Sequence, residues 1–147
     1  MKCNWQTESG TVNSPQVCGK KAAKGYTWCK EHIAHAKSNY PGLEIPATTL
    51  VIFRKWPKSE GGGILALFPY DPGTNDPYTC SCYEHIGQHG SANPGMCIAA
   101  TKPAKPEEYA NLKAELESEP YNYVLVVRRR LPSDAVDVRR KQLASYK

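Results

Sequence analysis

The pattern of apolar and polar positions divides the chain into a part with little periodicity and a part with strand-like and helix-like patterns. Residues 1–37 are rich in cysteine, lysine and glycine, and residues 38–47 contain two prolines and a glycine, which is typical of a linker. Residues 48–131 contain the apolar runs expected of a folded domain. Residues 132–147 are predicted to form a basic tail or a short helix.

Four runs in the domain predict strands ahead of a helix. Residues 50–56 and 64–68 are apolar and are separated by a loop with three consecutive glycines, which predicts a hairpin. Residues 78–83 alternate in a strand-like way, and residues 96–100 form a weaker strand-like run. Residues 87–95, which contain three glycines and a proline, are expected to be irregular.

One helix is predicted over Pro106–Ser118. A proline at the first helical position and two glutamates in the first turn favour a helix start there, because the helix dipole stabilises acidic groups at its N-terminus. The side chains of Tyr109, Leu112 and Leu116 form a narrow apolar stripe that would face a sheet. Residues 121–127 are the strongest strand candidate. The order ββββαβ predicts an α+β fold whose mainly antiparallel sheet is covered by one helix.

Composition narrows the classes of protein. A chain of 147 residues with 40% hydrophobic positions can bury a core, which argues against global disorder. No run approaches the roughly 20 apolar residues of a membrane helix. The first residues show no secretory signal, so we expect a cytoplasmic protein with no membrane partner.

The net charge of +5 is concentrated at the two ends of the chain. Residues 1–46 carry six lysines and three glutamates, residues 47–118 carry six basic and eight acidic residues, and residues 119–147 carry seven basic and three acidic residues. Clustered arginines can neutralise phosphates, so the C-terminal end predicts a nucleic-acid partner. A solvated basic tail is the alternative. The candidate nucleic-acid-binding residues are Arg128, Arg129, Arg130, Arg139, Arg140 and Lys141.

The strongest chemical signal is a set of four potential metal ligands near the N-terminus. Two residues separate Cys29 from His32, ten residues separate Cys18 from Cys29, and Cys3 would supply the fourth ligand. Three thiolates and one imidazole are a normal set for structural Zn²⁺, which would supply the folding energy that this apolar-poor segment lacks. Four protein ligands leave no open position for catalysis. A Cys3–Cys18 disulfide, and His35 as a substitute ligand, stay open as alternatives.

The same residues resemble a known motif. Cys3-Asn4-Trp5, Cys18-Gly19, Trp28-Cys29 and His32 are similar to the small zinc-binding motif at the C-terminal end of the bacterial cell-cycle regulator family GcrA. The resemblance implies a zinc module that acts as an interaction element in a bacterial or phage protein, and therefore a location in the bacterial host cytoplasm. Gln6 stands where the family motif has a proline, and the family's N-terminal DNA-binding helices have no counterpart in this sequence.

Five further potential ligands are Cys80, Cys82, His85, His89 and Cys97. They could hold a second metal, but on an extended strand Cys80 and Cys82 share one face while His85 points to the other. Buried cysteine is also an ordinary core residue. The spacing of His85 and His89 superficially resembles a zinc-hydrolase helix, although the general-base glutamate that follows the first histidine in such enzymes is absent.

A glycine-containing loop offers polar side chains to a ligand. Gln88 and His89 could recognise a nucleotide or phosphate together with Arg54 and Arg128, which we expect on one sheet edge. The alternative interpretation is a turn whose polar side chains satisfy local carbonyls.

A second resemblance covers residues 50–130. Val51–Lys55, Ala66–Pro69, Tyr83–Gly90 and Pro106–Tyr109 are similar to segments of small uncharacterised proteins encoded by phages and plasmids. The resemblance implies a mobile-element origin and brings no activity with it.

Three function classes follow from these observations. The favoured interpretation is a non-enzymatic, zinc-binding interaction protein of a phage or mobile element that contacts nucleic acid or a host protein and could form a homodimer. The first alternative is a counter-defence protein that binds or sequesters a nucleotide signal. The second is a small metal-dependent hydrolase or nuclease built on Glu84, His85 and His89.

Overall fold

The computed structural model describes residues 20, 23, 28–39, 42, 47–85 and 87–146. The chain falls into two compact units, Met1–Thr48 and Thr49–Lys147. In the described part of the first unit, helix α1 spans Lys30–Asn39 and so reaches into the start of the segment that the sequence predicts to be a linker.

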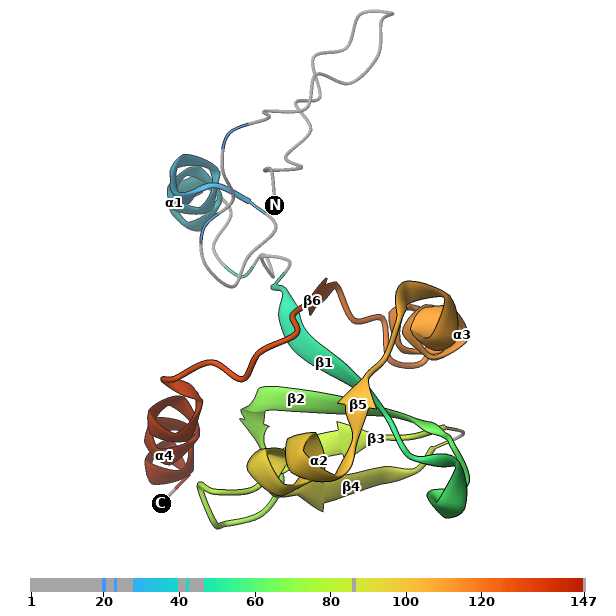
Figure 1. The fold of residues 1–147 in the computed structure, drawn as a ribbon. Helices are drawn as coiled ribbons and strands as arrows, with labels where there is room; N and C mark the ends of the chain where they lie inside the picture. The colour runs from blue at the N-terminus through green and yellow to red at the C-terminus, as the bar shows by residue number, and fades with distance from the viewer. Residues whose placement is uncertain are drawn as a thin grey trace, which may run out of the picture. The chain divides into compact units, whose positions relative to one another are not determined.

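The second unit, as far as the structure describes it, is an α+β fold on a six-stranded, mainly antiparallel sheet (Figure 1). The strands are β1 (Thr49–Lys55), β2 (Ile64–Pro72), β3 (Cys80–Tyr83), β4 (His89–Ala92), β5 (Lys102–Pro103) and β6 (Leu125–Val127). A 3-10 turn, η1 (Lys58–Glu60), and helices α2 (Pro94–Ala100), α3 (Pro106–Glu117) and α4 (Ala135–Ser145) complete the unit. The predicted fold class of this unit is confirmed.

The sheet is ordered β4–β3–β2–β1, and the outer edge of β1 pairs with two further strands. β1 and β2 form the predicted antiparallel hairpin, with Phe53 opposite Ala66. β5 pairs antiparallel with the C-terminal end of β1, and β6 pairs parallel with its N-terminal end. The 121–127 run is therefore a strand only over its last three residues.

Helix α3 covers one face of the sheet. Its Leu112 and Leu116 are buried against Val51 and Phe53 of β1, and the ring of Tyr109 stacks on Phe53 with centroids 4.3 Å apart. The predicted apolar stripe of α3 is confirmed, and so is its start at a proline.

Helix α2 covers the opposite face, where the sequence predicts a strand over residues 96–100. That prediction is wrong, because Asn93 and Pro94 start a helix. The Asn93 Oδ1 atom accepts the backbone N–H groups of Gly95 and Met96 at 3.0 and 3.2 Å, and Pro94 occupies the first turn. The buried residues of this face are Ile52, Leu65, Leu67, Cys80 and Cys82.

Residues 87–95 also differ from the prediction of an irregular segment. His89–Ala92 form β4, with His89 paired opposite Tyr83 of β3. The described element order after the first unit is therefore ββββαβαβα rather than ββββαβ. Among the residues that the structure describes, no helix has both the length and the apolar character needed to cross a membrane.

Candidate functional site

Two of the four predicted zinc ligands meet at the start of α1. The carbonyl of Cys29 accepts the N–H of Ile33 at 3.0 Å, so Cys29 occupies the position just before the helix and shares its first turn with His32. Cys29 is 4% exposed, and its Sγ lies 3.5 Å from Nδ1 of His32. Cys3 and Cys18 lie outside the described residues.

His35, the substitute ligand, lies one turn further along α1. Its Nδ1 is 3.2 Å from the side-chain nitrogen of Asn39. The imidazole that the structure places beside the Cys29 sulfur is that of His32.

The five ligands of the second set do not converge. Cys80 and Cys82 belong to the α2 face of the sheet, where Cys97 packs against them. The ring of His89 is 4.6 Å from that of Tyr83 on the α3 face. Burial raises the pKa of Cys80 to about 12 and raises the pKa values of Cys82 and Cys97, which favours protonated thiols. No group of three or more His, Cys, Asp or Glu side chains is placed to hold a metal within the described ranges.

A hydrogen-bonded cluster fixes the tip of the β3–β4 hairpin to α3. Glu115 of α3 accepts a hydrogen bond from the Tyr83 hydroxyl at Oε1, and its Oε2 lies 2.7 Å from Nδ1 of His85. The N–H of Gly87 donates to the Tyr83 hydroxyl oxygen at 2.9 Å, and the Tyr121 hydroxyl is 3.3 Å from the same oxygen. One carboxylate thus joins the hairpin to the helix at two points.

The proton positions in this cluster follow from its environment. Burial and the hydrogen bond to Glu115 raise the pKa of Tyr83, so the phenol stays protonated and donates. As a carboxylate, Glu115 can only accept, and therefore the His85 Nδ1 carries the proton that bonds it. In neutral His85 the Nε2 atom is then an acceptor, on a side chain that is 65% exposed. Carboxylate–histidine pairs orient imidazoles in this way in acid–base sites.

Sequence reasoning associates Glu84 with His85 and His89 and misses Glu115. The Glu84 carboxylate instead accepts a hydrogen bond from Trp56 Nε1 at 2.9 Å. Nothing local in the sequence marks Glu115, because its partners Tyr83 and His85 lie 32 and 30 residues away along the chain.

The residues of the predicted nucleotide site lie apart. Gln88 and His89 are exposed at the hairpin that leads into β4, which forms one edge of the sheet, whereas Arg128 follows β6 at the other edge. Four strand spacings of about 4.8 Å put roughly 19 Å between these edges. The prediction that they share one sheet edge is therefore wrong.

The side chain of Arg54, in β1, binds the C-terminal end of helix α2 and is not placed to bind a nucleotide. It is 5% exposed, and it donates to the Thr101 hydroxyl at 2.9 Å, to the Ile98 carbonyl at 2.9 Å and to the Thr101 carbonyl at 2.5 Å. A cation at these groups satisfies carbonyls that the helix leaves open and complements its dipole. This placement corrects the prediction of Arg54 as a ligand-binding residue.

The predicted nucleic-acid residues divide into exposed and buried side chains. Arg128, Arg129 and Arg130 are exposed directly after β6, and Arg140 and Lys141 are exposed on α4. These five side chains remain available to a polyanion.

Arg139 is the buried exception among these residues. It is 0% exposed, and it donates to the carbonyl of Pro77 at 2.7 Å and to the carbonyl of Pro69. Its guanidinium attaches α4 to Pro69 within β2 and to the loop that follows this strand. The prediction that Arg139 contacts nucleic acid is corrected accordingly.

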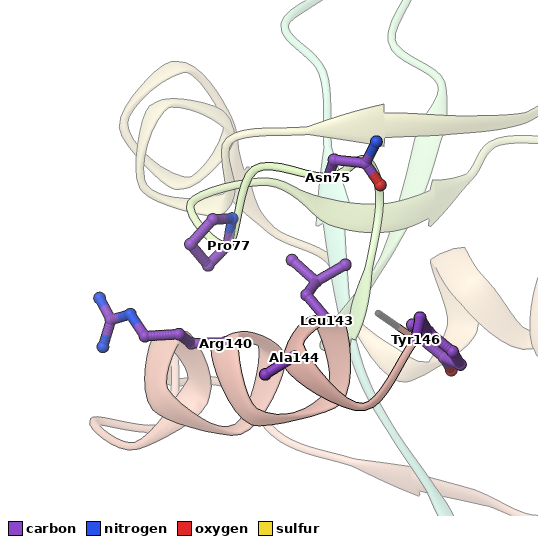
Figure 2. Close-up of a pocket in the computed structure, with 6 residues that line it drawn as sticks. All are labelled: Asn75, Pro77, Arg140, Leu143, Ala144 and Tyr146. Carbon is purple, nitrogen blue, oxygen red and sulfur yellow. The ribbon is translucent and has the colours of Figure 1, made fainter.

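An open hollow of about 670 Å³ lies between α4 and the loop of residues 73–79 (Figure 2). It is lined by Asn75, Pro77, Arg140, Leu143, Ala144 and Tyr146. Figure 2 shows Leu143 pointing from α4 toward the loop, with Arg140 and Tyr146 on either side of it along the helix. The volume is within the range of about 300–1,000 Å³ that is usual for small-molecule pockets.

Comparison with known proteins found no match: no family model, curated protein or solved structure matches the chain.

Proposed function

We propose that the chain is a non-enzymatic interaction protein in which a zinc ion folds the N-terminal segment and exposed arginines of the α+β unit contact nucleic acid. The observation that carries the proposal is Arg128–Arg130, three adjacent arginines that are exposed directly after β6. Guanidinium groups bind phosphate oxygens through two parallel hydrogen bonds, and each phosphate contact releases counterions from the nucleic acid.

The charge of the C-terminal region supports a polyanionic partner. Arg140 and Lys141 add two exposed cations on α4. Arg140 pairs with Asp137 at 2.6 Å, but their side chains are 55% and 68% exposed. An ion pair this exposed is worth about 0–1 kcal/mol, so a phosphate can displace the Asp137 carboxylate at little cost.

The geometry of Cys29 and His32 at the start of α1 supports the proposal of a zinc ion. Zinc lies about 2.3 Å from a thiolate sulfur and about 2.0–2.1 Å from an imidazole nitrogen, so two such ligands at the tetrahedral angle are about 3.6 Å apart. The separation of 3.5 Å between Cys29 Sγ and His32 Nδ1 fits this value. Cys3 and Cys18 would supply the two remaining thiolates, and the ion would hold the segment together without taking part in a reaction.

Native mass spectrometry of the purified full chain tests whether it binds zinc through Cys29 and His32. We expect one zinc per chain, which is lost in Cys29→Ser and in His32→Ala. Cys97→Ser and His35→Ala remove the same side-chain types elsewhere and should keep the metal. A zinc-free wild-type chain, or loss of zinc in the two control variants, would contradict the assignment.

Fluorescence anisotropy with labelled DNA and RNA tests the partner. The full chain should bind at low salt and release the oligonucleotide as salt rises, because the contacts are made to phosphates. Absence of binding to duplex and single-stranded probes at low salt would overturn the proposed function.

A further inference from the structure

The hollow beside α4 combines an apolar wall with an aromatic ring. Pro77, Leu143 and Ala144 form the apolar wall, and Tyr146 borders it at the end of the helix (Figure 2). Tyr146 is 79% exposed, and Tyr78, which follows Pro77 in the loop, is 57% exposed. Exposed aromatic rings in a basic region are the platforms on which unpaired bases stack, whatever the base.

Polar side chains that could bind a phosphate or a base edge also line or border the hollow. Arg140 lines the hollow, and Lys141 is exposed next to it on α4. The side-chain amide of Asn75 lines the hollow from the loop and offers both a donor and an acceptor to a base edge. A ligand with one planar aromatic group and one negative charge is complementary to this combination.

The loop that forms one wall is preorganised. The carboxylate of Asp76 accepts the N–H of Tyr78 at 2.9 Å, and the hydroxyls of Thr74 and Thr79 are 2.7 Å apart. A Cβ atom at Gly73 would lie 2.4 Å from the carbonyl oxygen of Cys80, so the loop packs too closely against β3 for any other residue there.

Helix α4, which forms the other wall, is attached to the same loop. The hydrogen bond from Arg139 to the Pro77 carbonyl links the two walls directly. A ligand therefore finds the two walls already in position and does not have to order them.

We propose that this hollow binds one nucleotide of a single-stranded nucleic acid. The base lies against Leu143 and Pro77 and stacks on Tyr146, and the adjoining phosphate is held by Arg140. The occupant is single-stranded because a base in a duplex is already stacked and cannot present its face to a tyrosine. This inference rests on the proposed function and names the class of nucleic acid that the C-terminal region takes.

The test compares single-stranded with duplex probes by fluorescence anisotropy on the full chain. Tyr146→Ala should weaken binding of a labelled 12-nucleotide single strand by about fivefold or more, the usual effect of losing one stacked base. Leu143→Glu replaces part of the apolar wall with a negative charge that repels a phosphate, so it should weaken the same binding further. Met96→Ala, at a residue 71% exposed on α2, and Ala99→Glu, at an exposed position of the same helix, are the matched controls and should leave it unchanged.

The outcomes separate this inference from the proposed function. If the wild-type chain binds single strands and both hollow variants bind equally well, the inference is overturned and the proposed function stands. If the wild-type chain binds neither probe, both fail. If free mononucleotides compete at micromolar concentration, the occupant is a free nucleotide and the single-strand assignment is overturned. Circular dichroism of each variant shows that a loss of binding is not a loss of folding.

Discussion

Arg139 and Arg140 are neighbours on α4 with opposite environments, so replacing each by methionine should separate stability from binding. Arg139→Met removes two charge-assisted hydrogen bonds, to the carbonyls of Pro69 and Pro77, from a side chain that is 0% exposed. Each such bond contributes about 1.5–3 kcal/mol, and methionine keeps most of the apolar stem in place. We expect the free energy of unfolding of the Thr49–Lys147 unit to fall by about 3 kcal/mol. For a domain of this size that lowers Tm by about 12–24 °C.

Arg140→Met is the matched control, because Arg140 is exposed and its ion pair with Asp137 is exposed too. We expect its unfolding free energy to stay within about 0.5 kcal/mol of wild type while single-strand affinity falls severalfold. Urea unfolding followed by far-ultraviolet circular dichroism, with anisotropy on the same samples, measures both quantities. The structural role of Arg139 is refuted if the unfolding free energy of Arg139→Met lies within about 1 kcal/mol of the wild-type value. It is also refuted if Arg140→Met is the less stable of the two variants.

Three further predictions concern the α+β unit. Arg54→Met should cost about 3 kcal/mol in urea unfolding, because the hydrogen bonds that end α2 are lost, and equal midpoints for Arg54→Met and the exposed Arg128→Met would contradict this. Tyr83→Phe should cost about 1–2 kcal/mol, since its hydroxyl joins the hairpin to α3; unchanged stability would show that the bonds to Glu115 and Gly87 contribute nothing. Glu108 accepts the Lys105 N–H and pairs with Lys55, and these contacts lower its pKa. Its charge therefore stabilises the fold above the unfolded-state pKa, and this stability is lost as pH falls through the lower folded-state pKa. At pH 7 the wild type should have a higher urea midpoint than Glu108→Gln, and this difference should disappear in acid. A difference that grows in acid would contradict the lowered pKa of Glu108.

The elements that the sequence predicts correctly are those whose signal is local. The β1–β2 hairpin follows from two apolar runs around a glycine loop, and α3 follows from a proline, two glutamates and an apolar stripe. Helix α2 had a local signal as well, Asn93 followed by Pro94, but its apolar residues 96–100 are equally compatible with a strand at that length.

The features that the sequence did not predict depend on contacts between distant residues. Arg139 binds carbonyls 62 and 70 residues away, and Glu115 binds Tyr83 and His85 across 32 and 30 residues. An arginine in a basic cluster looks the same in sequence whether it is exposed or attaches a helix to a sheet. Cys29 and His32, two of the proposed zinc ligands, show the opposite case, since their spacing within one helical turn is enough to predict their contact.

The salt dependence of nucleic-acid affinity tests the central claim most directly. Each phosphate contact contributes about 0.7 to the slope of log K against log salt for single strands and about 0.9 for duplex DNA. Replacing Arg128, Arg129 and Arg130 together by alanine should therefore reduce the slope by about 2–3. The matched triple change of the exposed Lys58, Lys102 and Lys105 removes the same charge and should leave the slope near that of wild type. Equal slopes for wild type and the arginine variant, or an equal loss in both triple variants, would contradict the account.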